Sequence, residues 1–299
     1  MLKAKLLKIV SFLMILTTLD CYISSKAEEI LKVGAIPDQN PEKLNRLYKL
    51  LTNELSKELK ISVKYIPVTN YAAAVTAFRT KNLDLVWFGG LTGVQARLQS
   101  PGSIVIAQRD IDKNFKSVFI ANTNVQIKEI KSIKDLRFLR NKRFTYGSEN
   151  STSGRLMPQY FLKQAGIKNS DFKGKRVGFS GSHDSTIALV QSGSYDVGAL
   201  NLQIWKQNIK SGKVDSKKVI QIWISPSYQD YHWLAQADLD NRFYKGFTNK
   251  LQKTFINLNR NSSNQAKILD LFGANRFIKA NSKDYKKIEK IGRKVGKIR

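Results

Sequence analysis

The sequence predicts an α/β fold with largely parallel sheets. Along most of the 299-residue chain, short apolar segments alternate with segments whose apolar residues recur at helical spacing. Glycine, proline or asparagine stands at many of the boundaries between them. This alternation is typical of parallel strands joined by crossover helices. In such folds ligands bind at the carboxyl ends of strands, where the following loop opens a helix.

The first half of the chain supplies strands and helices in turn. The predicted elements are a strand over 30–37, a helix over 41–59, a strand over 61–68, a helix over 70–82, a strand over 83–90 and a strand over 117–122. The helix over 41–59 is indicated by apolar residues that recur every three or four positions after Pro41. Asn70 is the expected N-cap of the helix that it opens.

The second half continues the pattern. The predicted elements are a segment over 135–147 that leads into a helix from Ser151, a strand over 176–181, a helix over 184–193, strands over 196–201 and 219–225, and two or three C-terminal helices. The segment over 283–299 is rich in lysine and arginine but has an apolar stripe at helical spacing. We expect it to be a helix docked on the body with a solvated cationic face, the alternative being a membrane or partner contact.

Residues 1–27 have the pattern of a secretory signal peptide. Three lysines precede an apolar run of 11 residues over 9–19, which is short for a membrane span. Small residues at Ser25 and Ala27 then predict cleavage after Ala27. A retained N-terminal anchor is the alternative. Lipid attachment to Cys21 is disfavoured because Asp20 replaces the small residue that a lipobox requires.

Composition points to an exported protein with an anionic partner. The formal charge is +28, and removal of residues 1–27, with four lysines and one aspartate, lowers it to +25. Such a charge favours anions without identifying them. Cys21 is the only cysteine, so the mature chain has no disulfide, which suits a bacterial periplasm. A hydrophobic content of 42% is enough for one large domain or two smaller ones.

Hydroxyl residues at a helix start form the main candidate site. Ser151, Thr152 and Ser153 open the helix that follows the segment over 135–147. Free N–H groups and the positive end of the helix dipole meet there, and hydroxyls add donors. A small oxyanion can bind such a site without a cationic side chain. The alternative is an ordinary N-cap with spare serines.

Other candidates lie on neighbouring strand-to-helix loops. His183, in the loop over 180–186, could donate to an oxyanion, although a lone histidine is more often structural. Tyr71 and Asp230 occupy comparable loops, with packing and solvent exposure as their alternative roles. Gly89 and Gly90 end a strand and permit close backbone approach, although a tight turn would use them equally well.

Signs of catalysis and of nucleic-acid binding are weak. The mature chain has no cysteine, and two histidines make a zinc site improbable, so we expect no metal and no cofactor. The sequence lacks a P-loop, a GxGxxG motif and a fitting nucleophile elbow. Basic residues are spread along the chain without a compact aromatic-interleaved patch, so no nucleic-acid partner is expected.

Taken together, five motifs resemble one family, the phosphate, phosphite and phosphonate substrate-binding proteins of ABC transporters, within the periplasmic binding protein superfamily. The motifs are VTNYAAAVTAF, DLVWFGGLTGVQAR, NSTSGRLMP, SGSHDSTIALVQSGSYDVGALN and SPSYQDYHW. The resemblance runs from about Ile30 to Asp238. It implies a type II fold with two α/β lobes, one over 28–120 and 222–299 and the other over 121–221, which close on a ligand about a hinge.

The resemblance also implies roles for the candidate residues. Ser151, Thr152 and Ser153 match the residues that bind phosphonate oxygens, Tyr71 and His183 match further ligand-binding positions, and Asp230 matches an aspartate that can accept a proton from the ligand. The segment over 197–214 has no acidic residue to bind the amine of an aminoalkylphosphonate. The Phe88-Gly89-Gly90 sequence is similar to the phosphite-binding branch.

These features predict a non-enzymatic, monomeric periplasmic receptor that gives phosphite or a small phosphonate to an ABC permease. A tight aromatic cage would set its specificity. The expected cage residues are Trp87, Phe88, Gly89, Gly90, Phe115, Tyr146 and Trp233. The alternatives are a receptor of the same fold for a larger phosphonate, inorganic phosphate or an amino acid, and an exported hydrolase or transferase that uses Ser151 or His183.

Overall fold

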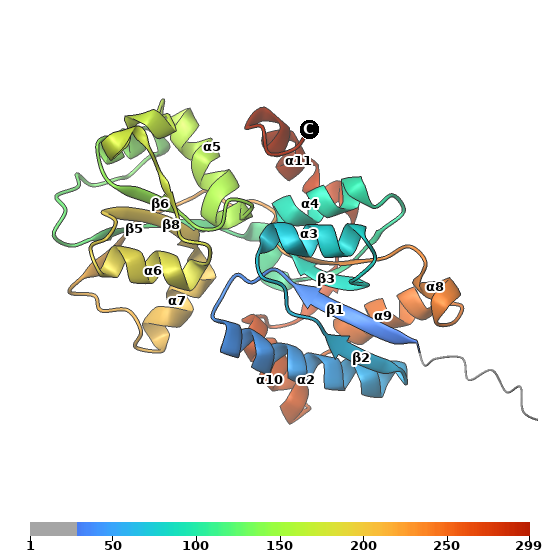
Figure 1. Ribbon diagram of the computed structural model, residues 1–299. Coiled ribbons are helices and arrows are strands. Elements are labelled where there is room, and N and C mark those ends of the chain that lie inside the picture. The colour runs from blue at the N-terminus through green and yellow to red at the C-terminus, as the bar shows by residue number, and fades with distance from the viewer. Residues whose placement is uncertain (1–28) are drawn as a thin grey trace, which may run out of the picture.

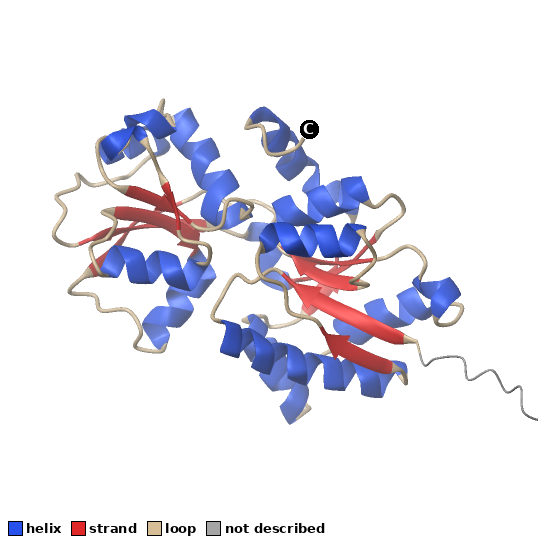
Figure 2. Cartoon of the chain, viewed as in Figure 1, coloured by secondary structure: helices blue, strands red, loops and turns tan. Residues whose placement is uncertain are grey.

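The computed structural model describes residues 29–299. The predicted signal peptide and Cys21 lie outside the described residues. The described chain forms two mixed sheets, with helices packed on both faces of each (Figures 1 and 2). The predicted α/β class is therefore confirmed.

The first sheet has six strands in the order β11-β4-β10-β3-β1-β2. Their bounds are β1 Ile30–Ala35, β2 Ser62–Tyr65, β3 Leu85–Phe88, β4 Ile104–Arg109, β10 His232–Ala235 and β11 Phe277–Lys279. Strand β1 is parallel to β2 and β3, whereas β10 runs antiparallel to both β3 and β4. A late segment of the chain thus occupies the middle of a sheet that early segments begin.

The second sheet has five strands in the order β7-β6-β8-β5-β9. Their bounds are β5 Ser117–Asn122, β6 Phe144–Tyr146, β7 Gly178–Phe179, β8 Val197–Asn201 and β9 Val219–Ile224. Strand β6 is parallel to β7 and β8, and β5 is antiparallel to β8 and β9. The expectation of largely parallel sheets therefore holds for only part of each sheet. The antiparallel pairs arise at β5 and β10, the strands that enter each sheet from the other one, and at β11, which is antiparallel to β4.

The chain crosses between the sheets twice. The outward crossing, 110–116, contains a short 3₁₀ helix over Asp110–Asn114, and the return crossing is 225–231. Phe115 and Tyr228 form an antiparallel bridge with two backbone hydrogen bonds of 2.9 Å. The predicted lobe limits at 120/121 and 221/222 fall inside β5 and β9. Because both strands pair wholly within the second sheet, the limits are corrected to the two crossings.

Most helices follow their sequence signals, but those over Gly90–Gln99 and Leu202–Lys210 were not predicted. Their bounds are α2 Pro41–Leu59, α3 Tyr71–Arg79, α4 Gly90–Gln99, α5 Met157–Gln164, α6 His183–Gln191, α7 Leu202–Lys210, α8 Leu239–Arg242, α9 Phe247–Ile256, α10 Ser263–Phe272 and α11 Lys286–Lys294. The Asn40 side chain caps α2 by accepting from the N–H groups of Glu42 and Lys43. In α11, Ile288 and Ile291 are buried against the body, as predicted.

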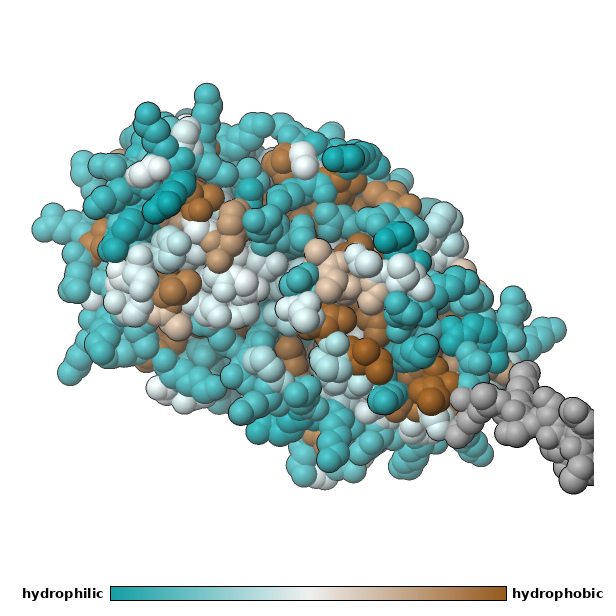
Figure 3. Space-filling view, viewed as in Figure 1, coloured by the Kyte–Doolittle hydropathy of each residue, from teal (hydrophilic) through white to brown (hydrophobic). Residues whose placement is uncertain are grey.

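Buried aromatic rings fill the first-sheet core. Trp87 and Trp233 are neighbours on adjacent strands, with ring centroids 5.3 Å apart, and Phe272 and Phe277 pack against them. The outer surface in view is mainly hydrophilic (Figure 3). Within residues 29–299, no helix combines the length and the apolar character that a membrane crossing demands.

Candidate ligand-binding site

The predicted hydroxyl triad lies at a helix start in the second sheet's half of the molecule. Strand β6 is followed by a loop, a π-helical turn over Thr152–Leu156 and then α5. Ser151, Thr152 and Ser153 are all buried, with at most 2% exposure. Ser151 Oγ accepts from the N–H of Gly154 at 2.9 Å, so Ser151 serves as the N-cap. The capping role that the sequence left open is thus present in the structure.

The start of α4 faces this triad from the other half. Gly90 N–H donates to Asp230 Oδ1 at 2.8 Å, and Leu91 N–H donates to Thr152 Oγ1 at 2.9 Å. A Cβ at Gly89 would lie 3.1 Å from Thr152 Oγ1 and 3.4 Å from Asp230 Oδ1. Glycine therefore allows the first turn of α4 to approach both side chains, as the sequence suggested for Gly89 and Gly90.

Several buried polar atoms around this contact have no protein partner. Within residues 29–299, the Tyr71 hydroxyl, Ser153 Oγ and Asp230 Oδ2 are buried without a hydrogen bond. Ser151 is close enough to lower the pKa of Tyr71, although burial keeps that pKa well above its usual value. An unsatisfied buried polar group costs about 1–3 kcal/mol, so a native structure holds few of them and each calls for an explanation. Their concentration beside Thr152 is typical of a site for a polar ligand.

Asp230 titrates close to neutral pH. Burial is the main cause that raises its pKa, and the charge of Asp112 adds to this effect. The Gly90 N–H and the Thr152 hydroxyl act in the opposite direction, and the resulting pKa is about 7. Near neutral pH the free Oδ2 can therefore accept a hydrogen bond as a carboxylate or donate one as an acid.

His183 belongs to a buried network between the two halves. Its Nδ1 accepts from the Asn201 N–H at 3.4 Å, which places the proton on Nε2, 3.3 Å from the Tyr231 hydroxyl. Tyr231 donates to Asp38 Oδ2 at 2.9 Å. Burial lowers the pKa of His183 to about 4, so the ring is neutral. The structure thus shows both ring nitrogens engaged by protein groups, and direct ligand contact stays a prediction.

Further contacts join the two halves across the same face. The Asn40 N–H donates to Asp184 at 2.8 Å, and Lys43 Nζ donates to Gln207 at 2.9 Å. Arg109 Nη1 donates to Gln203 at 2.8 Å. Together with the Leu91–Thr152 and His183–Tyr231 contacts, they describe two halves closed on each other. In the described residues, no three His, Cys, Asp or Glu side chains gather as a metal site requires.

Residues 33–285 match the family model of the periplasmic phosphonate substrate-binding proteins of ABC transporters. This chain belongs to that family. The match covers most of the described chain, including both sheets and every candidate ligand-binding residue.

Relatives place this chain within the phosphonate-binding family in more detail. A probable ABC transporter phosphite-binding protein, PhnD1 of Prochlorococcus marinus, is 61% identical over 271 residues, with 91% of each chain covered. The solved structure of PhnD1 with methylphosphonate has a TM-score of 0.89 and covers 90% of this chain and 99% of its own. The phosphonates-binding periplasmic protein of Escherichia coli is 26% identical over 68% of this chain and 60% of its own.

The residues expected to form an aromatic cage pack mainly in the cores and against the crossings, and their role as a cage stays a prediction. Trp87, Phe88 and Trp233 pack in the first-sheet core. The Tyr146 hydroxyl bonds to Asn169, and the Phe115 ring packs on Tyr228 and Tyr231 at the crossings. The physical reason is that helices cover both faces of β3 and β6, so side chains of either parity are used in the cores. Of the cage positions, Gly89 and Gly90 have contacts with Asp230.

Sequence reasoning missed a group of buried charged residues behind the site. Asp38 follows β1, and its pKa is raised to about 6, mainly by burial. Arg109 ends β4, forms a buried ion pair of 2.6 Å with Asp112, and lies 4.8 Å from the Tyr231 ring centroid. The strand-end rule that selected Ser151 would have selected Asp38 as well, whereas Arg109 ends a strand that the sequence did not predict. For Tyr231, the only sequence feature that pointed to the site was its position next to Asp230.

Proposed function

We propose that this protein is the periplasmic receptor of an ABC importer and captures phosphite or a small phosphonate such as methylphosphonate. The observation that carries the proposal is the set of buried polar atoms without protein partners, namely the Tyr71 hydroxyl, Ser153 Oγ and Asp230 Oδ2, beside Thr152. Hydroxyl and carboxyl groups in this arrangement suit an anion with several oxygens. PhnD1, 61% identical, has been solved with methylphosphonate.

Binding in this proposal involves no covalent chemistry. Tyr71, Ser153 and the backbone N–H groups at the helix starts donate to ligand oxygens. Asp230 accepts a proton from a singly protonated oxygen, or donates one to a fully ionised ligand. Closure of the two lobes then excludes water, which strengthens each hydrogen bond. The high positive charge of the chain steers anions toward the protein, most effectively at low salt.

The hydrolase alternative is less well supported. Ser151 Oγ is bonded by the Gly154 N–H, and the His183 ring is bonded by Asn201 and Tyr231. A nucleophilic mechanism would instead require a serine hydroxyl within reach of a base. We therefore assign these residues to ligand binding and lobe contact, and residues 1–27 to the export signal that brings a monomeric receptor to its permease.

Isothermal titration calorimetry with phosphite, methylphosphonate, 2-aminoethylphosphonate and phosphate tests this proposal. We expect tight binding of phosphite or methylphosphonate and weaker binding of the other two. Preferential binding of 2-aminoethylphosphonate would refute the argument from the segment over 197–214, which has no acidic residue. No heat with any of the four would refute the ligand class itself.

A further inference from the structure

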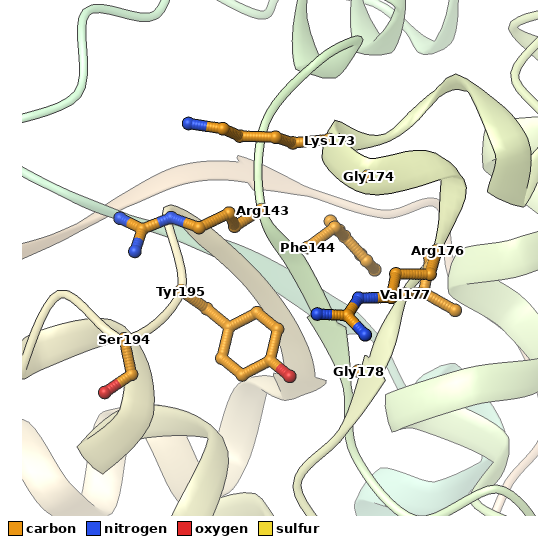
Figure 4. A pocket seen from close by; sticks show the side chains of 9 residues that line it. All are labelled: Arg143, Phe144, Lys173, Gly174, Arg176, Val177, Gly178, Ser194 and Tyr195. Atoms are coloured by element: carbon orange, nitrogen blue, oxygen red, sulfur yellow. The ribbon is translucent and has the colours of Figure 1, made fainter.

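A cavity of about 590 Å³ lies at the amino-terminal edge of the second sheet. Its lining comes from residues just before or at the start of β6, β7 and β8, including Arg143, Gly178 and Tyr195 (Figure 4). The candidate ligand site follows the carboxyl ends of the same strands. Because these strands have two to five residues, the cavity and that site are separated by roughly 7–17 Å along the sheet. The cavity is therefore distinct from the cleft.

Three cationic side chains from two segments surround this cavity. Arg143 stands just before β6, and Lys173 and Arg176 lie on the turn before β7 (Figure 4). Arg143 is fixed by Asp196, which accepts from its Nε at 2.9 Å and pairs with its Nη2 at 2.5 Å. The charge of Lys173 also helps Arg143 to lower the pKa of Asp196, so Asp196 is the acidic group that balances this cluster in part. The cavity thus retains two positive charges beyond those that Asp196 balances.

The cavity also has a built apolar wall. The Tyr195 ring lies against the backbone of Gly178, where an added Cβ would come within 2.4 Å of the ring carbon Cζ. Glycine at position 178 is therefore required to seat this ring. Val177 adds apolar surface beside it, and the fully buried Phe144 lies behind the wall. A site for a bare inorganic anion has no need of an aromatic wall or of this volume, which falls in the range for organic ligands.

We propose that this cavity binds an organic phosphate of about nucleotide size. The free Arg143 Nη1, the Arg176 guanidinium and Lys173 bind the phosphate oxygens, since guanidinium groups match phosphate geometry and lysine adds charge. The aromatic or apolar body of the ligand packs on Tyr195. This site is separate from the proposed phosphite cleft and does not depend on the identity of the cleft ligand.

Titration of the purified protein with ADP, in the presence of saturating methylphosphonate, tests the proposal. We expect ADP to bind, and the double variant Lys173→Gln/Arg176→Gln to lose about tenfold or more in ADP affinity, because each removed contact is a hydrogen bond to a charged group. Lys210→Gln/Lys217→Gln is the matched control, since both lysines are exposed, lie in the same lobe and change the net charge equally. Thermal unfolding of each variant, followed by circular dichroism, verifies that it is folded.

The Tyr195→Leu variant separates the two parts of the site. We expect it to weaken ADP binding while leaving binding of inorganic diphosphate unchanged. Absence of ADP binding to the wild-type protein would overturn the proposal. An equal loss of ADP affinity in the control double variant would also overturn it, because the effect would then come from net charge and not from this cavity.

Discussion

The backbone N–H of Leu91 donates to Thr152 Oγ1 at 2.9 Å, although the two residues lie in helical turns of different halves of the molecule. The start of α4 and the start of the α5 segment therefore meet directly. In the proposed function both face the anion. Each side thus contributes a helix start to one site, and closure of the lobes brings the two together.

Thr152→Val tests this contact with little change in shape. Valine keeps the volume but removes the hydroxyl that accepts from Leu91 and reaches the site. We expect phosphite binding to weaken by about 1.5–3 kcal/mol, the range for hydrogen bonds to charged groups. Calorimetry on Thr76→Val, an exposed position of α3, provides the control. Unchanged affinity in Thr152→Val would remove Thr152 from the site.

The Ser151→Ala and Ser153→Ala variants should differ in their free energy of unfolding but lose phosphite affinity to a similar extent. Ser151 caps its helix by accepting from the Gly154 N–H, so its replacement by alanine should lower the free energy of unfolding by about 0.5–2 kcal/mol. Ser153 Oγ has no partner in the described residues, so Ser153→Ala should leave the stability of the ligand-free protein unchanged or higher. Both variants should bind phosphite about 1.5–3 kcal/mol more weakly. Urea unfolding and calorimetry measure the two effects, and a large loss of stability in Ser153→Ala would contradict the assignment.

Asp230 should make ligand-free stability depend on pH. Its pKa is about 7 in the folded protein against an ordinary value of 3.8, so folding retains a proton that the unfolded chain releases. Its contribution to stability therefore falls as the pH rises from about 4 to about 7 and stays low above that. Asp230→Asn removes this loss. We expect the unfolding free energy of the variant, relative to wild type, to rise by on the order of a few kcal/mol between pH 4.5 and pH 8.

The comparison between wild type and Asp230→Asn cancels other titrating groups, including Asp38 and His183. Thermal unfolding at several pH values provides the measurement. A stability difference that does not change with pH would show that Asp230 is ionised in the ligand-free protein throughout the range.

Tyr231→Phe should weaken binding by loosening the closed form. The Tyr231 hydroxyl joins His183 and Asn201 of the second half to Asp38 of the first. Because contacts between the halves form only on closure, their loss should raise the dissociation constant, by about tenfold if the cost is near 1.4 kcal/mol. Small-angle scattering with ligand should show a larger fraction of open molecules. Tyr160→Phe, which changes a half-buried hydroxyl of α5, is the control; equal affinities of wild type and Tyr231→Phe would contradict this role.

The sequence was sufficient for the α/β class and for the strand-end loops that hold the site. Ser153 was selected because hydroxyls at a helix start are chemically conspicuous, and Asp230 because it matches an aspartate of the family; their contact with a ligand stays a prediction. The strand over Ile104–Arg109, the helix over Gly90–Gln99 and the short strands β10 and β11 were not predicted. Strands β10 and β11 have only four and three residues, too short to give a periodic signal.

Trp87, Phe88 and Trp233 pack in the first-sheet core for a reason that composition could not reveal. Trp87 and Phe88 are consecutive in β3 and point to opposite faces of the sheet, yet both faces are covered. Neither the face of the strand on which a side chain lies nor its aromatic character then distinguishes a core residue from a cleft residue. The Tyr231 network was missed for a related reason, since it depends on pairs that are 48 and 193 residues apart in the sequence.

The position of β10 has a consequence for biosynthesis. This strand lies between β3 and β4, so those two early strands have no common partner until residues 232–235 have been made. Contacts of such high sequence separation form slowly, because the intervening chain must first be ordered. A nascent chain that ends before residue 232 therefore stays short of its native first lobe. The complete first sheet therefore forms only once nearly the whole chain is available.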